Sequence, residues 1–362
     1  MKVNSVFSKP QRIHPLFYIR IVLLLLTGIL LLSCSASENS KSPALSKKPI
    51  QAETDVFAMD TFITLKAYGP DADTLLESAK DRIAALEKLL SVTDSDSDIW
   101  KLNHANGQST TVGEDTAAII RGAIEISTLT DGALDISVYP LVSAWGFTTG
   151  SYQIPTEDTI QSLLPYVNYK KIVLDALCVT LPYGMQIDLG AAAKGYTGDV
   201  IAALLREGGI SSAMLNLGGN VHTIGTKQDG SPWKIAIANP FTPQTNLLTL
   251  DITNEVVITS GNYERYFTDE NGKRYCHIID SKTGYPADHG IVSMTIVGDN
   301  GLTCDALSTA LYVMGAEKAI EVWQETGGFE MIFVTEDKTI YLTEGLSDRY
   351  TNISNLPLII LS

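Results

Sequence analysis

The chain has few cysteines for its length. Among 362 residues there are four, and only Cys178, Cys276 and Cys304 follow residue 34. These three are far apart, odd in number and without a Cys-x-x-Cys spacing, which argues against a disulfide framework and against a zinc site. We expect them to be buried thiols that pack as small apolar side chains.

Positive charge is also scarce. The sequence has 26 Lys and Arg against 41 Asp and Glu, a formal net charge of -15. Residues 1–33 hold four basic and no acidic residues, so the remainder carries -15 - 4 = -19. Such an acidic surface repels phosphate backbones, which argues against nucleic-acid binding. A small anionic ligand stays compatible with it, through a local cation or a nest of backbone N–H groups.

Long hydrophobic runs are missing except near the N-terminus, where IVLLLLTGILLLSC spans residues 21–34. Basic residues precede this run and small residues end it, which is typical of a secretory signal. The run is short for a membrane span. Its ending, LLSC, resembles the bacterial lipoprotein box, in which the cysteine, here Cys34, is lipidated. The alternatives are an uncleaved anchor and a free core cysteine. We expect an exported bacterial lipoprotein, anchored to the cell membrane and facing outside the cytoplasm.

The next segment, residues 35–51, is rich in Ser, Lys, Pro, Ala and Asn and predicts a flexible tether. We therefore divide the chain into a lipoprotein signal peptide at 1–33, the lipidated Cys34 with its tether at 34–51, and one folded domain at 52–362.

The domain shows helical and strand patterns in mixed order. Residues 55–69 alternate apolar and polar side chains and predict a strand. Helices are expected at 71–92, 113–132 and 190–209, a strand hairpin at 171–189, and a long irregular stretch at 133–150, of a length that is often functional. This order favours an α/β fold of the α+β type, a single body around a mixed, largely antiparallel sheet with flanking helices.

The helix expected at Thr303–Gly315, TCDALSTALYVMG, is apolar apart from one polar face. Asp305 and Thr309 are four residues apart, so a helix presents both on the same side. Thr303 predicts the N-cap, and Asp305 would then only favour the helix dipole, while Thr309 could return its hydroxyl to a backbone carbonyl. Alternatively, a carboxylate and a hydroxyl one turn apart can hold a magnesium ion, which prefers oxygen ligands.

Two further segments could carry chemistry. In DLGAAAKGYTGD, residues 188–199, a strand leads into a helix and places Lys194 and backbone N–H groups at an anion site. The segment matches neither Gly-x-Gly-x-x-Gly nor a Walker A motif, and close packing with a solvated Lys194 is the alternative. In YCHIIDSKTGYPA, His277 has a pKa suited to proton transfer, although a structural histidine is equally open.

These segments occur together with others in a recognisable order. The blocks AMDT, SDIWKLN, TDGALDISVYPLVSAWGF, DLGAAAKGY, LNLGGN, SGNYER, HIIDSKTGYP and TCDALSTALYVMG run in sequence through nearly all of the chain after the tether. In these blocks the chain resembles the ApbE-type family of FAD:protein FMN transferases. The resemblance implies an α/β body with a mixed sheet that binds FAD in a long cleft.

The resemblance also assigns roles to single residues. It implies a Mg²⁺ ion held by the Asp305 carboxylate, the Thr309 hydroxyl and the Ala191 carbonyl, with His277 as the base. Cofactor-binding residues are then Met59, Ala133, Leu134, Asp135, Asp188, Lys194 and Ile278. FMN would pass from FAD to a Ser or Thr hydroxyl of an acceptor flavoprotein, such as a membrane redox-pump subunit with a motif like Asp-x-x-Ser/Thr-Gly-Ala-Thr, and AMP would leave.

Three positions depart from the family pattern. Asp60 replaces a common Gly, and Asn220 and Asn262 stand where acidic residues are frequent, so we expect Asp60 to crowd or repel the flavin edge. Two other functions remain open at this stage. One is a Mg²⁺-dependent FAD pyrophosphatase, in which water replaces the acceptor hydroxyl, and the other is a lipoprotein that binds flavin without catalysis.

Overall fold

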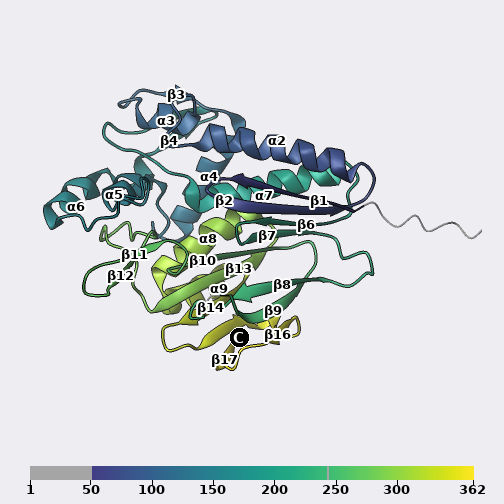
Figure 1. Ribbon diagram of the computed structural model, residues 1–362. Coiled ribbons are helices and arrows are strands. Elements are labelled where there is room, and N and C mark those ends of the chain that lie inside the picture. The colour runs from purple at the N-terminus through teal and green to yellow at the C-terminus, as the bar shows by residue number, and fades with distance from the viewer. Residues whose placement is uncertain (1–50, 243) are drawn as a thin grey trace, which may run out of the picture. The chain divides into compact units, whose positions relative to one another are not determined.

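The computed structural model describes residues 51–242 and 244–362, which fall in one compact unit (Figure 1). The signal peptide, Cys34 and almost all of the tether lie outside the described residues. Within the described part, none of the helices has the length and apolar character needed to cross a membrane.

A nine-stranded sheet forms the centre of the unit. Its order is β1 (Gln51–Ala58), β2 (Thr61–Tyr68), β6 (Ser212–Leu217), β7 (Asn220–Ile224), β10 (Val256–Gly261), β13 (Ile291–Gly298), β14 (Glu330–Thr335), β15 (Ile340–Thr343) and β17 (Leu358–Leu361). All neighbours pair antiparallel except β15 and β17, which are parallel. The predicted mixed, largely antiparallel sheet is confirmed.

Three small sheets accompany it. They are β16 (Tyr350–Asn352), β9 (Asn246–Ile252) and β8 (Trp233–Ala238) in one; β3 (Thr110–Thr111), β5 (Cys178–Thr180) and β4 (Val173–Asp175) in another; and the hairpin of β11 (Tyr266–Thr268) and β12 (Arg274–Cys276). Of the hairpin predicted at 171–189, β4 and β5 are present. Residues 181–189 form no strand, so the prediction that a strand leads directly into the helix at residue 190 is wrong.

The helices are α2 (Ala72–Leu90), α3 (Asp98–Asn103), α4 (Glu114–Leu129), α5 (Tyr139–Ala144), α6 (Glu157–Leu163), α7 (Gly190–Glu207), α8 (Gly301–Met314) and α9 (Ala316–Thr326). Short 3₁₀ turns are η1 (Ile136–Val138), η2 (Leu164–Tyr166), η3 (Tyr169–Lys171) and η4 (Glu344–Leu346). The predicted helices correspond to α2, α4, α7 and α8, whereas the stretch expected to be irregular contains η1 and α5.

Helices cover one face of the large sheet, and the β8–β9–β16 sheet covers part of the other (Figure 1). Alternate side chains of β10 show this: Val256 and Ile258 pack in the helical core, and Val257 packs against the small sheet. Every residue of β13 is buried because both of its faces are covered. The helix α2 likewise has one buried apolar face, and Leu76, Ala79 and Ile83 of that face pack with residues of β1 and β2.

The stretch predicted as one strand at 55–69 is a hairpin. Ala58 pairs with Thr61, and the loop between them has only Met59 and Asp60, with φ of 52° and 63°. Two positive φ values define the type I′ turn that suits a two-residue hairpin. Apolar and polar side chains alternate on both sides of the turn, so the periodicity alone does not reveal it.

The cysteines are free, as expected, but only two of them are buried. Cys276 and Cys304 lie in the core, whereas Cys178 is exposed. The prediction of a buried thiol is therefore wrong for Cys178. It lies on the short strand β5, whose exposed and buried positions alternate.

Candidate active site

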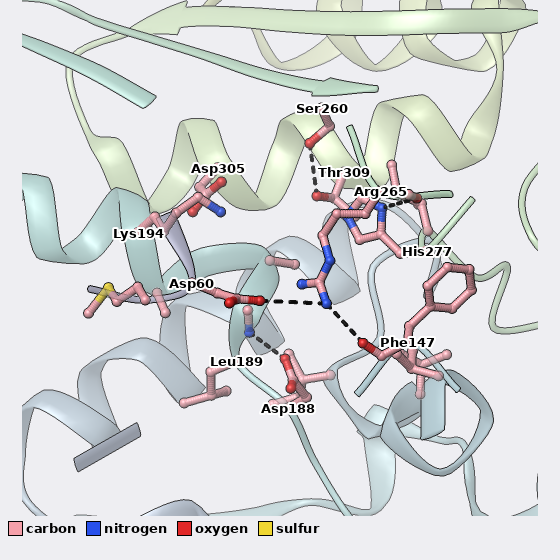
Figure 2. A pocket seen from close by; sticks show the side chains of 18 of the residues that line it. Asp60, Phe147, Asp188, Leu189, Lys194, Ser260, Arg265, His277, Asp305 and Thr309 are labelled. Atoms are coloured by element: carbon pink, nitrogen blue, oxygen red, sulfur yellow. Dashed lines mark hydrogen bonds and ion pairs between the residues drawn. The ribbon is translucent and has the colours of Figure 1, made fainter. Parts of the chain in front are cut away.

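A cleft of about 510 Å³ opens where the β1–β2 turn, α7, α8 and the segments around residues 135 and 277 meet. A cavity of this size is typical of cofactor and small-molecule sites. It is lined by all eleven described residues to which the resemblance gives a role: Met59, Ala133, Leu134, Asp135, Asp188, Ala191, Lys194, His277, Ile278, Asp305 and Thr309. Figure 2 shows Asp305 and Thr309 projecting from α8 toward this space.

Glycines let α7 and α8 cross at very short range. A Cβ on Gly195 would lie 2.0 Å from the Gly301 carbonyl oxygen and 2.7 Å from the Asp305 Cβ. Because no side chain intervenes, the Gly195 N–H donates to Asp305 Oδ2 at 2.8 Å. In an α-helix the N–H of residue 195 faces the carbonyl of residue 191. The crossing therefore brings the Asp305 carboxylate next to the Ala191 carbonyl.

Asp305 is a buried carboxylate with little compensation. Its residue is 4 % exposed, and it takes part in no ion pair among the described residues. Desolvation raises the pKa of Asp305, while Lys194 and the Gly195 N–H oppose that rise. A buried charge of this kind is costly unless a cation accompanies it.

Hydroxyl groups continue the polar surface along α8. Ser260 Oγ on β10 lies 3.2 Å from Thr309 Oγ1 and 2.8 Å from Ser308 Oγ. No hydrogen bond joins Thr309 Oγ1 to a backbone carbonyl in the described part of the chain, so the alternative of a hydroxyl folded back on its own helix is not observed. The Thr309 hydroxyl is thus held toward the cleft by Ser260 (Figure 2).

The N-cap predicted for α8 was wrong. Asn300, not Thr303, caps the helix, because the Asn300 side chain accepts from the Thr303 N–H at 2.9 Å. Asp199 of α7 accepts the Gly301 and Leu302 N–H groups at 2.7 and 3.0 Å. With the helix starting earlier, Asp305 lies beyond the first turn, so helix capping does not explain it.

Asp188 and Lys194 flank the start of α7. Asp188 Oδ1 accepts the Gly190 N–H at 2.6 Å. Burial raises the pKa of Asp188, and the Gly190 N–H, Arg265 and Lys194 oppose the rise. The positive charge of Lys194 opposes the rise in the pKa of three carboxyl groups, those of Asp188, Asp305 and Glu264. The predicted cationic position is therefore among carboxylates rather than free in solvent.

His277 is held as a neutral imidazole. Its Nδ1 lies 3.2 Å from the Arg265 carbonyl oxygen. Because a carbonyl can only accept, the proton belongs on Nδ1 and the lone pair on Nε2. Burial, aided by the Arg265 charge, lowers the pKa of His277 to about 4. The ring can therefore accept a proton at neutral pH.

Two charged lining residues were missed as site residues, although both lie in the quoted block SGNYER. The Arg265 guanidinium donates to the Phe147 carbonyl oxygen at 2.8 Å and lies 3.9 Å from Asp60 Oδ2 (Figure 2). Burial raises the pKa of Glu264 to about 7, and Lys194 opposes this. The available signal was the position of these two charged residues in the short segment between β10 and β11.

The remaining assigned residues form the walls. Asp135 lines the cleft. Its Oδ1 accepts hydrogen bonds from the Ser137 N–H and hydroxyl, and its Oδ2 accepts one from the Tyr169 N–H. The carboxylate therefore fixes the conformation of the cleft wall. Leu134 and Ile278 are buried apolar side chains of the same cleft.

The three departures differ in position. Asp60 and Asn220 line the cleft, and Asn262 is not among its lining residues. Asp60 adopts the left-handed backbone that a glycine also favours, and Asx residues tolerate it. The Asn220 amide nitrogen is buried beside the Asp305 carboxylate and helps to lower the pKa of that carboxyl.

The donor set suits a hard cation. No cluster of three or more His, Cys, Asp or Glu side chains with metal-binding geometry occurs in the described ranges. One carboxylate, one hydroxyl and one carbonyl nevertheless provide only oxygen donors, and Mg²⁺ is often held by one or two carboxylates with substrate phosphates. The buried Asp305 carboxylate, which has no ion-pair partner among the described residues, fits that role.

A family model described as "ApbE family" matches residues 59–333. The chain belongs to the ApbE family. Relatives named FAD:protein FMN transferase include one from Klebsiella pneumoniae (32% identity; 82% of this chain and 93% of the relative covered) and one from Haemophilus influenzae (33%; 77% and 86%).

Solved structures of ApbE proteins share the fold. The ApbE protein of Thermotoga maritima has a TM-score of 0.78 at 31% identity, covering 83% of this chain and 99% of that one. The flavin transferase ApbE from Vibrio cholerae has a TM-score of 0.76 at 26% identity with the same two coverages. The resemblance deduced from the motifs is confirmed.

Proposed function

We propose that this ApbE-family protein transfers FMN from FAD to a Ser or Thr hydroxyl of an acceptor flavoprotein and releases AMP, with Mg²⁺ as cofactor. One observation carries the proposal: the oxygen donors of α7 and α8, the cation Lys194 and the neutral His277 all line a single cleft. The activity named for the relatives agrees with it.

The reaction is a displacement at phosphorus. The acceptor hydroxyl oxygen forms a bond to the FMN-side phosphorus of FAD, and the bond from that phosphorus to the bridging oxygen breaks. AMP leaves with that oxygen, and the hydroxyl proton passes to His277 Nε2. Because His277 is neutral at pH 7 and its Nδ1 proton is fixed on the Arg265 carbonyl, Nε2 is oriented to accept it.

Asp305, Thr309 and the Ala191 carbonyl would hold the Mg²⁺ ion. When bound, the ion neutralises charge on the pyrophosphate and polarises its oxygens. The close crossing at Gly195 fixes Asp305 against α7, so the carboxylate is in place before the substrate arrives. That arrangement avoids reorganisation during the reaction.

The chain's own cations and donors orient the phosphates. Lys194 and Arg265 both face the cleft of an otherwise acidic protein. The buried Asn220 amide lies beside Asp305 and supports that carboxylate. Apolar side chains of Met59, Leu134 and Ile278 would contact the isoalloxazine and ribityl parts, which need no ionic partner.

We further propose that Cys34 is lipidated and that the domain acts outside the cytoplasm, tethered to the membrane by residues 35–51. The support is the basic and apolar pattern of residues 1–33 followed by LLSC. A tethered enzyme would reach acceptor segments of membrane redox-pump subunits.

The test is an assay with purified protein, FAD, Mg²⁺ and a domain carrying an Asp-x-x-Thr-Gly-Ala-Thr segment. Mass spectrometry is expected to show the domain gaining FMN, with one AMP released per adduct. Free FMN and AMP without an adduct would instead identify a pyrophosphatase. No AMP under any of these conditions would leave only flavin binding and reject the proposal.

A further inference from the structure

An exposed pair of aromatic rings lies at the tip of the β1–β2 hairpin. Phe57 and Phe62 are 61% and 76% exposed. They face each other across the two strands, with ring centroids 5.1 Å apart and planes at 70°. Single exposed apolar residues are common, but two adjacent phenylalanines form an apolar patch whose exposure to water is unfavourable in free energy.

The pair is the last row of a ladder whose next two rows are polar. On the same face, Lys66 pairs with Glu53 at 3.3 Å, and Thr64 donates to Asp55 at 2.6 Å. Within each of those rows, the two polar side chains bind each other across the strands. The aromatic row differs because its surface is left open to solvent.

The aromatic row is also the row next to the cleft. Met59 and Asp60, the two turn residues beyond the Ala58–Thr61 pair that follows this row, line the cleft. The tip is firmly held, because the Met59 N–H donates to Glu87 of α2 at 2.6 Å and Thr197 of α7 contacts the Met59 sulfur at 3.6 Å. The patch therefore has a fixed position beside the reaction site.

We propose that the Phe57–Phe62 pair is a docking surface for the acceptor protein. This inference rests on the proposed function, in which a hydroxyl of a folded partner must enter the cleft past the hairpin tip. The partner would place an apolar side chain against the two rings while its hydroxyl-bearing segment reaches His277. Aromatic anchors beside a catalytic cleft are well suited to this, since they bind through area and not through charge.

Charge favours a protein partner over a lipid surface. The hairpin carries three carboxylates, Glu53, Asp55 and Asp60, against one cation, Lys66, and the chain after residue 33 has a formal net charge of -15 - 4 = -19. Anionic lipid headgroups would be repelled by this edge. The same acidity disfavours a second copy of the chain on the patch.

The test compares Phe57→Ser/Phe62→Ser with the wild-type protein in FMN transfer to the domain carrying Asp-x-x-Thr-Gly-Ala-Thr. We expect KM for the domain to rise about tenfold, as for loss of an interface hot spot. We expect kcat at saturating domain and the affinity for FAD to change by less than about twofold, because neither ring lines the cleft. Phe57→Tyr/Phe62→Tyr is expected to restore KM.

Tyr183 provides the matched control. It is 75% exposed but lines a separate hollow beside Asn103 and Gly107, none of whose residues lines the cleft, so Tyr183→Ser is expected to leave KM unchanged. Should the double variant fail to bind FAD, the more exposed Phe62→Ser alone carries the test, with a smaller rise in KM.

Three results would overturn the inference. They are a wild-type KM in the double variant, an equal rise in KM for Tyr183→Ser, and loss of binding to phosphatidylglycerol vesicles with KM unchanged. All three presuppose transfer by the wild-type protein. If the wild-type protein transfers no FMN, the proposed function itself fails, so the two failures are distinguishable.

Discussion

The two sides of the cleft differ in how tightly they are packed. At the α7–α8 crossing a Cβ on Gly195 would lie 2.0 Å from a backbone oxygen, and Asp305 is 4 % exposed. At the mouth, the Asp60 and Arg265 side chains are 78% and 49% exposed and 3.9 Å apart. The packed side can hold a small ion and a pyrophosphate in one geometry. The open side can admit the segment of another protein.

Removing the charge of the packed side should have the largest effect. Asp305→Asn keeps the shape and still accepts the Gly195 N–H, but it weakens Mg²⁺ binding. We expect transfer to fall about 10³-fold, since the ion contributes several kcal/mol, while the unfolding temperature does not fall, because a poorly compensated buried charge is lost. AMP release measures the rate of transfer, and calorimetry measures the unfolding temperature. Asp299→Asn, at an exposed aspartate, is the control. Near-normal transfer would remove Asp305 from the metal site.

The loss of the proposed base should come next. His277→Ala is expected to slow transfer by roughly 10²- to 10⁴-fold while FAD still binds. Single-turnover rates and flavin fluorescence titration separate the two effects. His289→Ala, at a half-exposed histidine that does not line the cleft, is the control. An unchanged rate would assign His277 a structural role.

The crossing itself can be tested by adding one methyl group. Gly195→Ala should lower the free energy of unfolding by about 1–3 kcal/mol, the usual cost of overpacking, because the methyl meets backbone and not a flexible side-chain end. Urea denaturation measures this. Gly113→Ala, where the nearest atom is 3.4 Å away, is the matched control. Equal stability of the two variants would show that the helices can separate without cost.

The pH dependence follows from the lowered pKa of His277, about 4. The ring must be neutral to accept a proton, so its contribution is present above that pKa and is lost as the pH falls through it. We expect kcat/KM to be independent of His277 titration from neutral pH to about 5 and to fall about tenfold per unit below 4. An acid limb near 6.5 that His277→Ala abolishes would contradict this.

The smallest effect is expected at the mouth. Asp60→Gly keeps the type I′ turn, removes a carboxylate from the mouth of the cleft and frees Arg265. Because the Asp60–Arg265 pair is exposed and contributes little stability, we expect FAD to bind a few-fold tighter, measured by fluorescence titration. Asp71→Gly, also at positive φ but away from the cleft, should leave FAD affinity unchanged. Weaker FAD binding would show that Asp60 helps to hold the substrate.

The sequence was informative about features that depend on local periodicity or on several motifs that occur in a fixed order. The helix α2 and the antiparallel character of the sheet were visible in this way, and the motif residues on α7 and α8 line one cleft. The motifs were informative because they combine residues that are distant in the chain.

Predictions failed where a distant partner decides the outcome. Thr303 is a reasonable cap by itself, but Asn300 caps α8 and Asp199 takes the first N–H groups from about a hundred residues away. Arg265 and Glu264 were not singled out, since only the folded chain brings them to the cleft. The hairpin at Met59 was missed because its alternation continues through the turn.

The two-residue length of that turn has a consequence for how this enzyme could change partners. Side chains of a strand alternate between faces, so one inserted residue that shifts the register would swap the outward phenylalanine for its inward neighbour. Such an insertion changes no residue of α7 or α8, where the ion and the pyrophosphate would be held. Acceptor choice could therefore diverge between homologous proteins through turn length alone, with the chemistry left intact.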